Sequence, residues 1–160
     1  MPQPAEVQAF LDDQSPDAFS KLVDRLLDSP HYGERWGRHW LDLARYSDSN
    51  GFKTDETRTS AWRYRDYFIS SLNDDKPYDR CMAEQIAGDE LWPTSPDARI
   101  TTAFNRHYPD ESNAANLVQR RAELLQDVTD TVGATFLGMT FGGAERPTIV
   151  GGQLIEGALA

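Results

Sequence analysis

The sequence predicts an all-α fold: a single irregular multi-helix domain with long polar loops and an irregular C-terminal tail. Apolar residues recur at intervals of three and four in several separate segments, which is typical of amphipathic helices. Ser-Pro pairs open three of these segments. Serine at the N-cap with proline at the first helical position is a favourable start for a helix. No segment alternates convincingly between apolar and polar residues, as a half-buried strand does.

Three helices are expected in the first part of the chain. The first covers residues 4–11, and the second begins at Ser15 and ends at Ser29, where a Pro follows. The third begins there and runs to about Tyr46. Its expected buried stripe consists of Trp36, Trp40, Leu43 and Ala44.

Residues 47–59 are polar, contain glycine and almost lack aliphatic side chains, so they are expected to form a loop. The remaining helices are expected at residues 60–72, 79–87, 98–104 and 113–136. From Gly138 onward glycine is frequent and the helical periodicity disappears. The helical domain is therefore placed at residues 1–142, and residues 143–160 are expected to be a disordered or loosely attached tail. In the alternative, residues 149–155 form a strand or helix docked on the body.

Charge and cysteine content exclude several classes of protein. The formal net charge is -10, which disfavours binding to nucleic acid or to an anionic membrane surface. Cys81 is the only cysteine, so neither an intramolecular disulfide nor a Cys-pair metal site can form. No apolar run approaches a membrane span, and the N-terminus lacks the pattern of a secretory signal. Taken literally, the chain is expected to be cytoplasmic.

Six ordered blocks are idiosyncratic enough to indicate a family. They read LVDRLLDSPHYGERW at 22–36, HWLDLARY at 39–46, YRDY at 64–67, NDDKPYD at 73–79, EQIAGDEL at 84–91 and LGMT at 137–140. Through them residues 16–142 resemble the domain of unknown function found in planctomycete cytochrome-c-type proteins. The resemblance implies a large secreted parent protein, periplasmic or extracellular, with haem c. It also implies neighbouring domains as partners.

The resemblance stops abruptly after Gly142. Family members continue into a Cys-x-x-Cys-His motif, whereas Gly143, Arg146 and Pro147 stand in those three positions here. The chain lacks the thiols for covalent haem and the axial histidine, so no cofactor is expected in it. We interpret the loss of resemblance as a frameshift, a truncated gene or a gene-end artefact.

One group of side chains is a candidate for catalysis. His39, Asp42 and Arg45 lie at i, i+3 and i+6 of one predicted helix, and Asp48 follows. A His–Asp pair can act as a general base when the carboxylate fixes the imidazole tautomer. A structural histidine beside Trp40 is the favoured interpretation, because no nucleophile can be assigned.

A second group, in the polar loop, is a candidate for metal binding. Asp48, Asn50 and Asp55 could supply oxygen ligands to a cation. An EF-hand is excluded, because Tyr46 and Thr57 occupy its first and twelfth ligand positions. A solvated acidic loop with Asx turns is favoured over a looser metal site.

The aromatic residues allow two interpretations as well. They could form a sugar-stacking platform, but at helical spacing such side chains are more often core. The set consists of Trp36, Trp40, Trp62, Tyr64, Tyr67 and Phe68.

The expected function is a non-catalytic helical module of a secreted c-type-cytochrome-associated protein. The alternative is part of an extracytoplasmic oxidoreductase or polysaccharide-processing enzyme with the His39, Asp42, Arg45 and Asp48 edge in its cleft.

Overall fold

The computed structural model describes residues 2–51, 55–110, 115–140, 148–150 and 153–155. The chain is all-α, as predicted. Its α-helices are α1 (Pro4–Asp12), α2 (Ala18–Leu27), α3 (His31–Leu43), α4 (Trp62–Asn73), α5 (Tyr78–Leu91), α6 (Pro96–Thr101) and α7 (Leu117–Val132). A 3-10 helix, η1 (Thr102–Arg106), follows α6, and a π-helical turn, η2 (Gly133–Leu137), follows α7.

The described part of the tail contains two short strands, as the alternative expectation for residues 149–155 allowed, and their docking on the body stays a prediction. Strands β1 (Thr148–Val150) and β2 (Gln153–Ile155) pair as a short antiparallel hairpin. The other residues from 143 onward lie outside the described residues, so the loosely attached tail stays a prediction. The helix before it ends as expected, because Gly138 takes a left-handed conformation with φ 63°.

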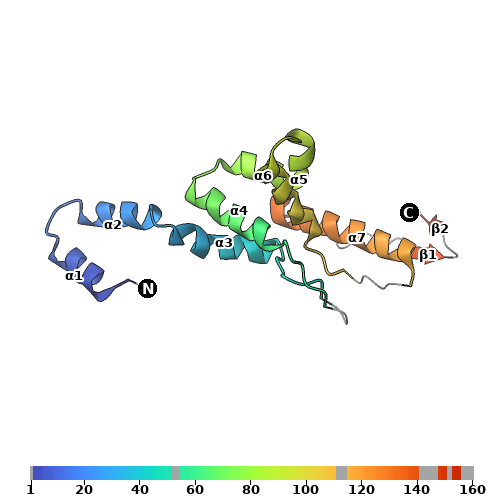
Figure 1. Cartoon of the computed structure of the whole chain (residues 1–160), viewed down its shortest axis with the longest axis horizontal. Helices are drawn as coiled ribbons and strands as arrows, with labels where there is room; N and C mark the ends of the chain where they lie inside the picture. Colours follow the sequence, from blue (N-terminus) through green and yellow to red (C-terminus); the bar gives the residue numbers. More distant parts are fainter. Residues whose placement is uncertain (1, 52–54, 111–114, 141–147, 151–152, 156–160) are drawn as a thin grey trace.

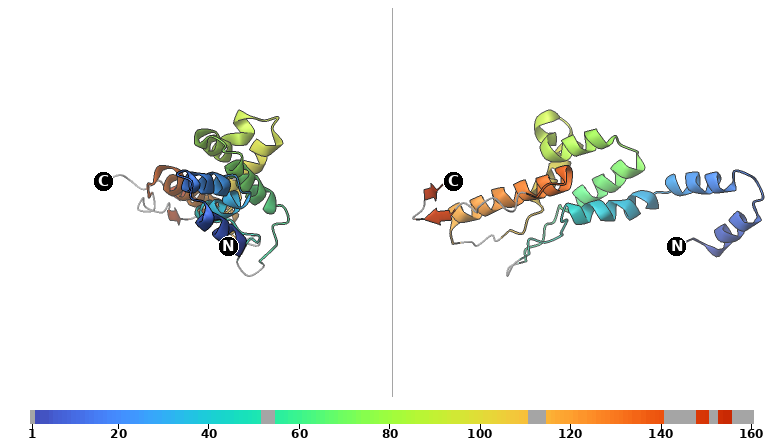
Figure 2. Two further views of the ribbon diagram at one scale, coloured as in Figure 1. Left: turned by 90° about the vertical axis from the view of Figure 1, so that its left-hand side faces the viewer. Right: turned by 180° about the vertical axis from the view of Figure 1, so that it is seen from behind.

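The helices form an elongated molecule with a packed centre (Figures 1 and 2). Helices α3, α4, α5 and α6 pack together in the middle, where α3 lies along α4 and α5 contacts both α6 and η1. Helices α1 and α2 project from the start of α3, and we call them the arm. Helix α7 extends towards the opposite end of the molecule.

The core lies where α3, α4 and η1 meet. Ala44, Tyr64 and Phe104 are buried at its centre. Trp40 packs against this centre and stacks on Phe68 with a ring-centroid distance of 5.2 Å. Phe136 closes the cluster from η2, at 4.9 Å from the Phe104 ring.

The buried stripe predicted for α3 was only partly right. Ala44 is buried and Trp40 half-buried, but Trp36 and Leu43 are 52% and 54% exposed. The face turned towards α4 instead contains Gly33 and Gly37. Glycine lets the α4 backbone approach closely, so the smallest residues of this helix rather than its bulkiest ones mark the inward face.

The sequence also placed the end of α3 too far along the chain. The helix ends at Leu43 rather than Tyr46, since Arg45 adopts a left-handed conformation with φ 56°. Non-glycine residues rarely adopt positive φ, and nothing in the helical spacing of apolar side chains signals it.

Replacing either inward-facing glycine of α3 by alanine should change the free energy of unfolding, but by different amounts at the two positions. At Gly33 a Cβ would lie 2.4 Å from the Ile69 backbone oxygen, whereas at Gly37 the nearest atom is the Ile69 side-chain carbon Cγ1 at 3.2 Å. We expect Gly33→Ala to lower the free energy of unfolding by about 2–3 kcal/mol. Gly37→Ala should change it by less than about 1 kcal/mol, because helix propensity offsets the crowding. Urea unfolding followed by far-ultraviolet circular dichroism measures both, and equal losses would contradict this packing.

Candidate functional site

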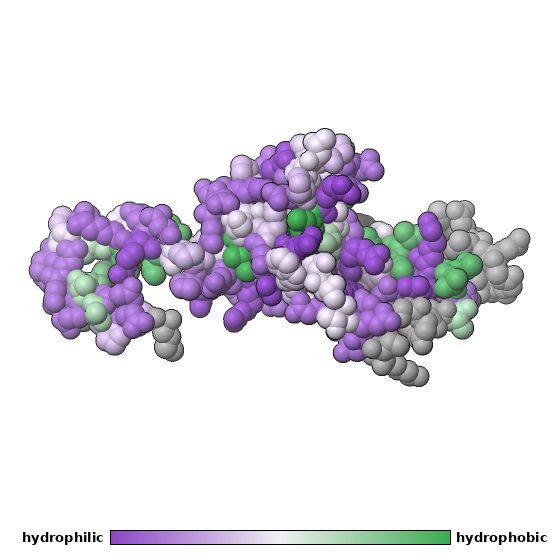
Figure 3. Space-filling model, viewed as in Figure 1, coloured by the Kyte–Doolittle hydropathy of each residue, from purple (hydrophilic) through white to green (hydrophobic). Residues whose placement is uncertain are grey.

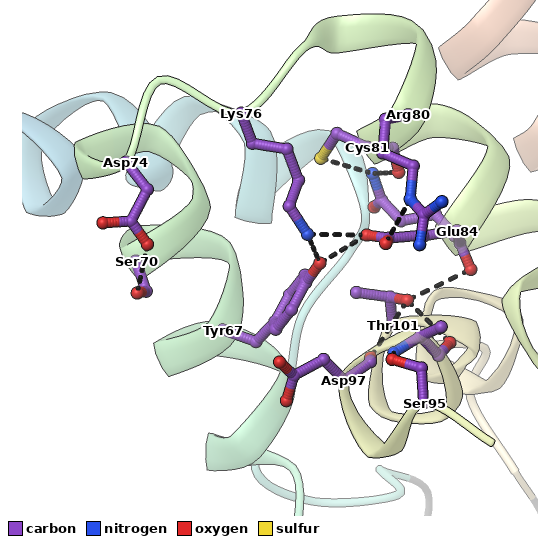
Figure 4. Close-up of polar contacts among 12 residues, drawn as sticks. Tyr67, Ser70, Asp74, Lys76, Arg80, Cys81, Glu84, Ser95, Asp97 and Thr101 are labelled. Atoms are coloured by element: carbon purple, nitrogen blue, oxygen red, sulfur yellow. Dashed lines mark hydrogen bonds and ion pairs between the residues drawn. The ribbon is translucent and has the colours of Figure 1, made fainter. Parts of the chain in front are cut away.

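A buried carboxylate organises the most polar region of the packed centre. Glu84 of α5 is 2% exposed. Its Oε2 accepts hydrogen bonds from Lys76 Nζ at 2.9 Å and from the Tyr67 hydroxyl, and its Oε1 accepts one from Arg80 Nε at 2.6 Å (Figure 4). Arg80 also stacks over the Trp92 ring, 3.3 Å from its centroid. We call Tyr67, Lys76, Arg80 and Glu84 the Glu84 cluster.

The pKa values of Glu84, Lys76 and Tyr67 shift in the directions that keep the carboxylate and the amine charged and the phenol protonated. Burial opposes the charged form of Glu84, but the hydrogen bonds from Tyr67, Lys76 and Arg80 outweigh it and lower its pKa. Burial likewise opposes the charge on Lys76, yet its bonds to Tyr67 and Glu84 raise its pKa. Burial raises the pKa of Tyr67, and its bond to Glu84 adds to the effect. Through these hydrogen bonds the Glu84 carboxylate clamps α4, the turn after it and α5 together.

An open cavity of about 610 Å³ lies beside the Glu84 cluster. Tyr67 and Lys76 belong to both, so the buried carboxylate fixes two side chains of the cavity wall. The cavity is lined by Trp62, Arg63, Tyr67, Ser70, Ser71, Asp74, Lys76, Asp97 and Ile100.

A second group of hydrogen-bonded side chains crosses the core between α3, α4 and α5. Trp40 Nε1 donates to Gln85 Oε1 at 2.8 Å and to the Tyr64 hydroxyl at 3.1 Å. The Tyr64 hydroxyl donates to the same Gln85 oxygen at 2.6 Å, and Gln85 is fully buried. Buried polar groups that satisfy one another hold the helices in one arrangement.

His107 is buried beside these hydrogen-bonded side chains, and its ring centroid lies 4.6 Å from that of Tyr64. Its Nδ1 has no hydrogen-bond partner among the described residues. Burial lowers the pKa of His107 to about 4, and the positive charges of Arg58 and Arg45 act in the same direction, while a hydrogen bond with the Ala44 backbone opposes them. The folded protein therefore holds this histidine neutral at pH 7.

Acid should weaken the fold through His107. Its ordinary pKa is 6.5 and its folded pKa about 4, so between these values the unfolded chain binds a proton that the folded chain does not. The free energy of unfolding should fall by about 3 kcal/mol from pH 6.5 to pH 4 on this account. His107→Gln should abolish that part of the pH dependence, whereas His31→Gln, at an exposed position, should leave it. Urea titrations at several pH values measure it, and an identical profile for His107→Gln would contradict the assignment.

The four candidate catalytic residues do not form one hydrogen-bonded group in the described structure. His39 is exposed and packs against Trp36, with ring centroids 5.6 Å apart. Arg45 forms a bidentate ion pair with Asp127 of α7, at 2.9 and 2.6 Å. Asp48 accepts from the Tyr46 hydroxyl at 2.6 Å, and Asp42 is exposed on α3. A catalytic role for this edge stays a prediction.

The loop that contains the candidate metal ligands is held by hydrogen bonds of its own. Asn50 Oδ1 accepts from Arg58 Nε at 2.7 Å, and Asp55 Oδ1 accepts from the Gly51 backbone N–H at 3.1 Å. Across the described residues, no three His, Cys, Asp or Glu side chains are gathered as a metal-binding group. A site formed by Asp48, Asn50 and Asp55 therefore also stays a prediction.

The chain's donor set does not fit covalent haem c, which needs two thiols. Cys81 is the only cysteine; it is 6% exposed, and burial raises the pKa of its thiol. Gly143, Arg146 and Pro147, where the resemblance led us to expect a haem motif, lie outside the described residues, so that expectation stays untested.

The arm presents an apolar groove. Its volume is about 790 Å³, and side chains of α1, α2 and the start of α3 line it, including Val7, Phe10, Leu22, Val23, Leu26 and Trp36. No residue of α1 or α2 is buried, although α2 is strongly amphipathic, and Phe19 is 70% exposed. Apolar side chains also show on the surface around α7 (Figure 3), where Leu117 and Leu125 are exposed.

Comparison with known proteins identifies the family. Residues 1–145 match the family model described as "PSCyt2: Protein of unknown function (DUF1549)". The chain belongs to this family. No curated protein and no solved structure matches the chain. Among the described residues of this DUF1549 domain, no helix is long and apolar enough to cross a membrane.

Several of the blocks that carry the resemblance meet in space within this DUF1549 domain. The Asn73 side chain accepts from the Gly33 N–H at 2.7 Å and donates to the Pro30 carbonyl at 3.0 Å, which joins the first block to NDDKPYD. YRDY contributes Tyr64 and Tyr67, while EQIAGDEL contributes Glu84 and Gln85. The signal for this site in the sequence was thus a pair of polar residues in YRDY and another pair in EQIAGDEL.

Proposed function

We propose that this DUF1549 domain is a non-catalytic helical module of a larger extracytoplasmic protein associated with haem c, and that a neighbouring domain of that protein covers the arm. The observation that carries the proposal is the apolar groove between α1, α2 and α3. Contiguous exposed apolar surface of this kind marks sites of protein interaction. Burying one large aliphatic or aromatic side chain contributes about 1.5–3 kcal/mol, so several of them can fix a domain interface.

The chemistry of the packed centre supports a structural role. Glu84, Gln85 and Trp40 make hydrogen bonds that join α3, α4 and α5, since Glu84 accepts from Tyr67 and Gln85 accepts from Trp40. The pKa of Glu84 is lowered and that of Lys76 raised, so neither exchanges a proton readily near pH 7. In this proposal the haem resides on a neighbouring domain, because the one thiol of this chain is buried in its own core.

A hydrophobic dye tests whether the groove is open. The isolated chain should bind 1-anilinonaphthalene-8-sulfonate with a clear rise in fluorescence. Leu26→Glu, which places a charge in the groove, should remove most of that rise. Ser20→Glu is the matched control, because Ser20 is exposed on the same helix and does not line the groove. Absence of dye binding by the unaltered chain, or equal binding by both variants, would contradict the proposal.

A further inference from the structure

We propose that the open cavity beside the Glu84 cluster binds a neutral saccharide, with Trp62 as its stacking platform. This inference is independent of the proposed packing of the arm, which lies on other helices. It follows from the size of the cavity, from the exposed tryptophan at its edge and from the balance of polar groups around it.

The cavity has the size and position of a small-ligand site. Its volume of about 610 Å³ lies in the range of roughly 300–1,000 Å³ that holds small organic ligands. Residues of α4, the turn after it and α6 line it, so its walls come from helices that also pack together. An oligosaccharide can enter from solvent because the cavity is open on one side.

Trp62 gives the cavity an apolar face. It is the first residue of α4 and remains 47% exposed, unlike the core aromatics Tyr64 and Phe68 of the same helix. The Arg63 guanidinium lies 5.6 Å from the Trp62 ring centroid. A flat indole with a polar N–H edge suits a ligand with one apolar face and hydroxyl groups around it, such as a pyranose ring.

The polar groups around the cavity suit hydroxyl groups. Lys76 and Tyr67 are held in place by Glu84, so a cationic donor and a phenol are preorganised in the wall. Ser70 Oγ donates to Asp74 at 3.1 Å, and Figure 4 shows the Asp97 carboxylate projecting from α6 on the Tyr67 side. Hydroxyl groups both donate and accept hydrogen bonds, and this wall offers partners of both kinds.

The charge balance favours a neutral ligand over an anionic one. Arg63 and Lys76 bring two positive charges to the lining, and Asp74 and Asp97 bring two negative ones. A site for phosphate or a uronic acid is expected to carry an excess of cations, because an unbalanced carboxylate repels an anion.

Isothermal titration calorimetry with the whole chain tests the inference. The probes are cello-, xylo- and manno-oligosaccharides at millimolar concentrations, together with oligogalacturonates as charged counterparts. At least one neutral oligosaccharide should bind, and Trp62→Ala should weaken that binding by about tenfold. Tyr78→Ala is the matched control, because Tyr78 is an aromatic residue that is 66% exposed and lies outside the lining of the cavity. Circular dichroism establishes that both variants fold.

Three results would overturn the inference. They are no binding of any neutral probe, binding of the oligogalacturonates alone, and unchanged affinity in folded Trp62→Ala protein. The dye experiment on the arm reports on a separate surface, so the two proposals can fail independently.

Discussion

Replacing Trp40 by alanine should lower the free energy of unfolding by about 3 kcal/mol, the lower end of the range measured for buried large aromatic side chains, because the Trp40 side chain is half-buried. The Trp40 ring stacks on Phe68 and lies 5.8 Å from Phe136, and its Nε1 donates to the buried Gln85. Removing it opens a cavity between α3, α4 and η2 and also leaves one donor fewer for the Gln85 oxygen. Chemical denaturation followed by circular dichroism measures the change.

Trp36→Ala is the control for Trp40, since both residues belong to α3 and differ in burial. Trp36 is 52% exposed, so replacing it by alanine should lower the free energy of unfolding by less than about 1 kcal/mol. Similar losses at the two positions would show that the inward face of α3 has been wrongly assigned.

Replacing Glu84 by glutamine should lower the free energy of unfolding by about 3 kcal/mol. The change keeps the shape of the side chain but removes the charge that compensates Lys76 and Arg80, and breaking a buried ion pair on one side costs about 3–5 kcal/mol. We place the effect at the lower end, because water partly screens Arg80, whose side chain is 38% exposed.

Glu90→Gln is the matched control, because Glu90 is an exposed glutamate of the same helix, and it should have almost no effect. The charge on Glu84 also gives a pH signature. Its pKa is lowered in the fold, so its contribution is complete above 4.5 and is lost as the pH falls through the lower folded value. Glu84→Gln should lack this loss at acid pH, and a variant as stable as the unaltered protein would contradict the clamp.

Most helices could be predicted from the sequence because apolar periodicity is a local signal. Of the three predicted Ser-Pro starts, only Ser95 caps its helix, accepting from the Ala98 N–H at 3.2 Å, whereas α2 and α3 begin without a serine cap. The inward face of α3 could not be predicted, because large apolar residues such as Trp36 and Leu43 are expected to be buried before glycines such as Gly33 and Gly37. Close approach of two helix backbones reverses that order. The spacing of Gly33 and Gly37 by one helical turn was the available clue.

The Glu84 cluster could not be predicted for a different reason. Tyr67, Lys76 and Glu84 come from α4, from the turn after it and from α5, and a pattern within one helix cannot bring them together. The blocks that contain these residues are distinctive in the sequence, but only the fold shows that they meet. Conversely, His39, Asp42 and Arg45 are close in sequence, and the left-handed turn at Arg45 directs that side chain to Asp127.

Amide hydrogen exchange across the arm tests the proposed docking most directly. The measurement compares Ala18–Leu27 in the isolated chain with the same helix in the longer polypeptide that carries the neighbouring domains. We predict fast exchange in the isolated chain, because none of these residues is buried, and strong protection in the longer polypeptide. Trp62–Asn73, which packs against α3, should be equally protected in both. Equal exchange of Ala18–Leu27 in the two proteins would contradict the account.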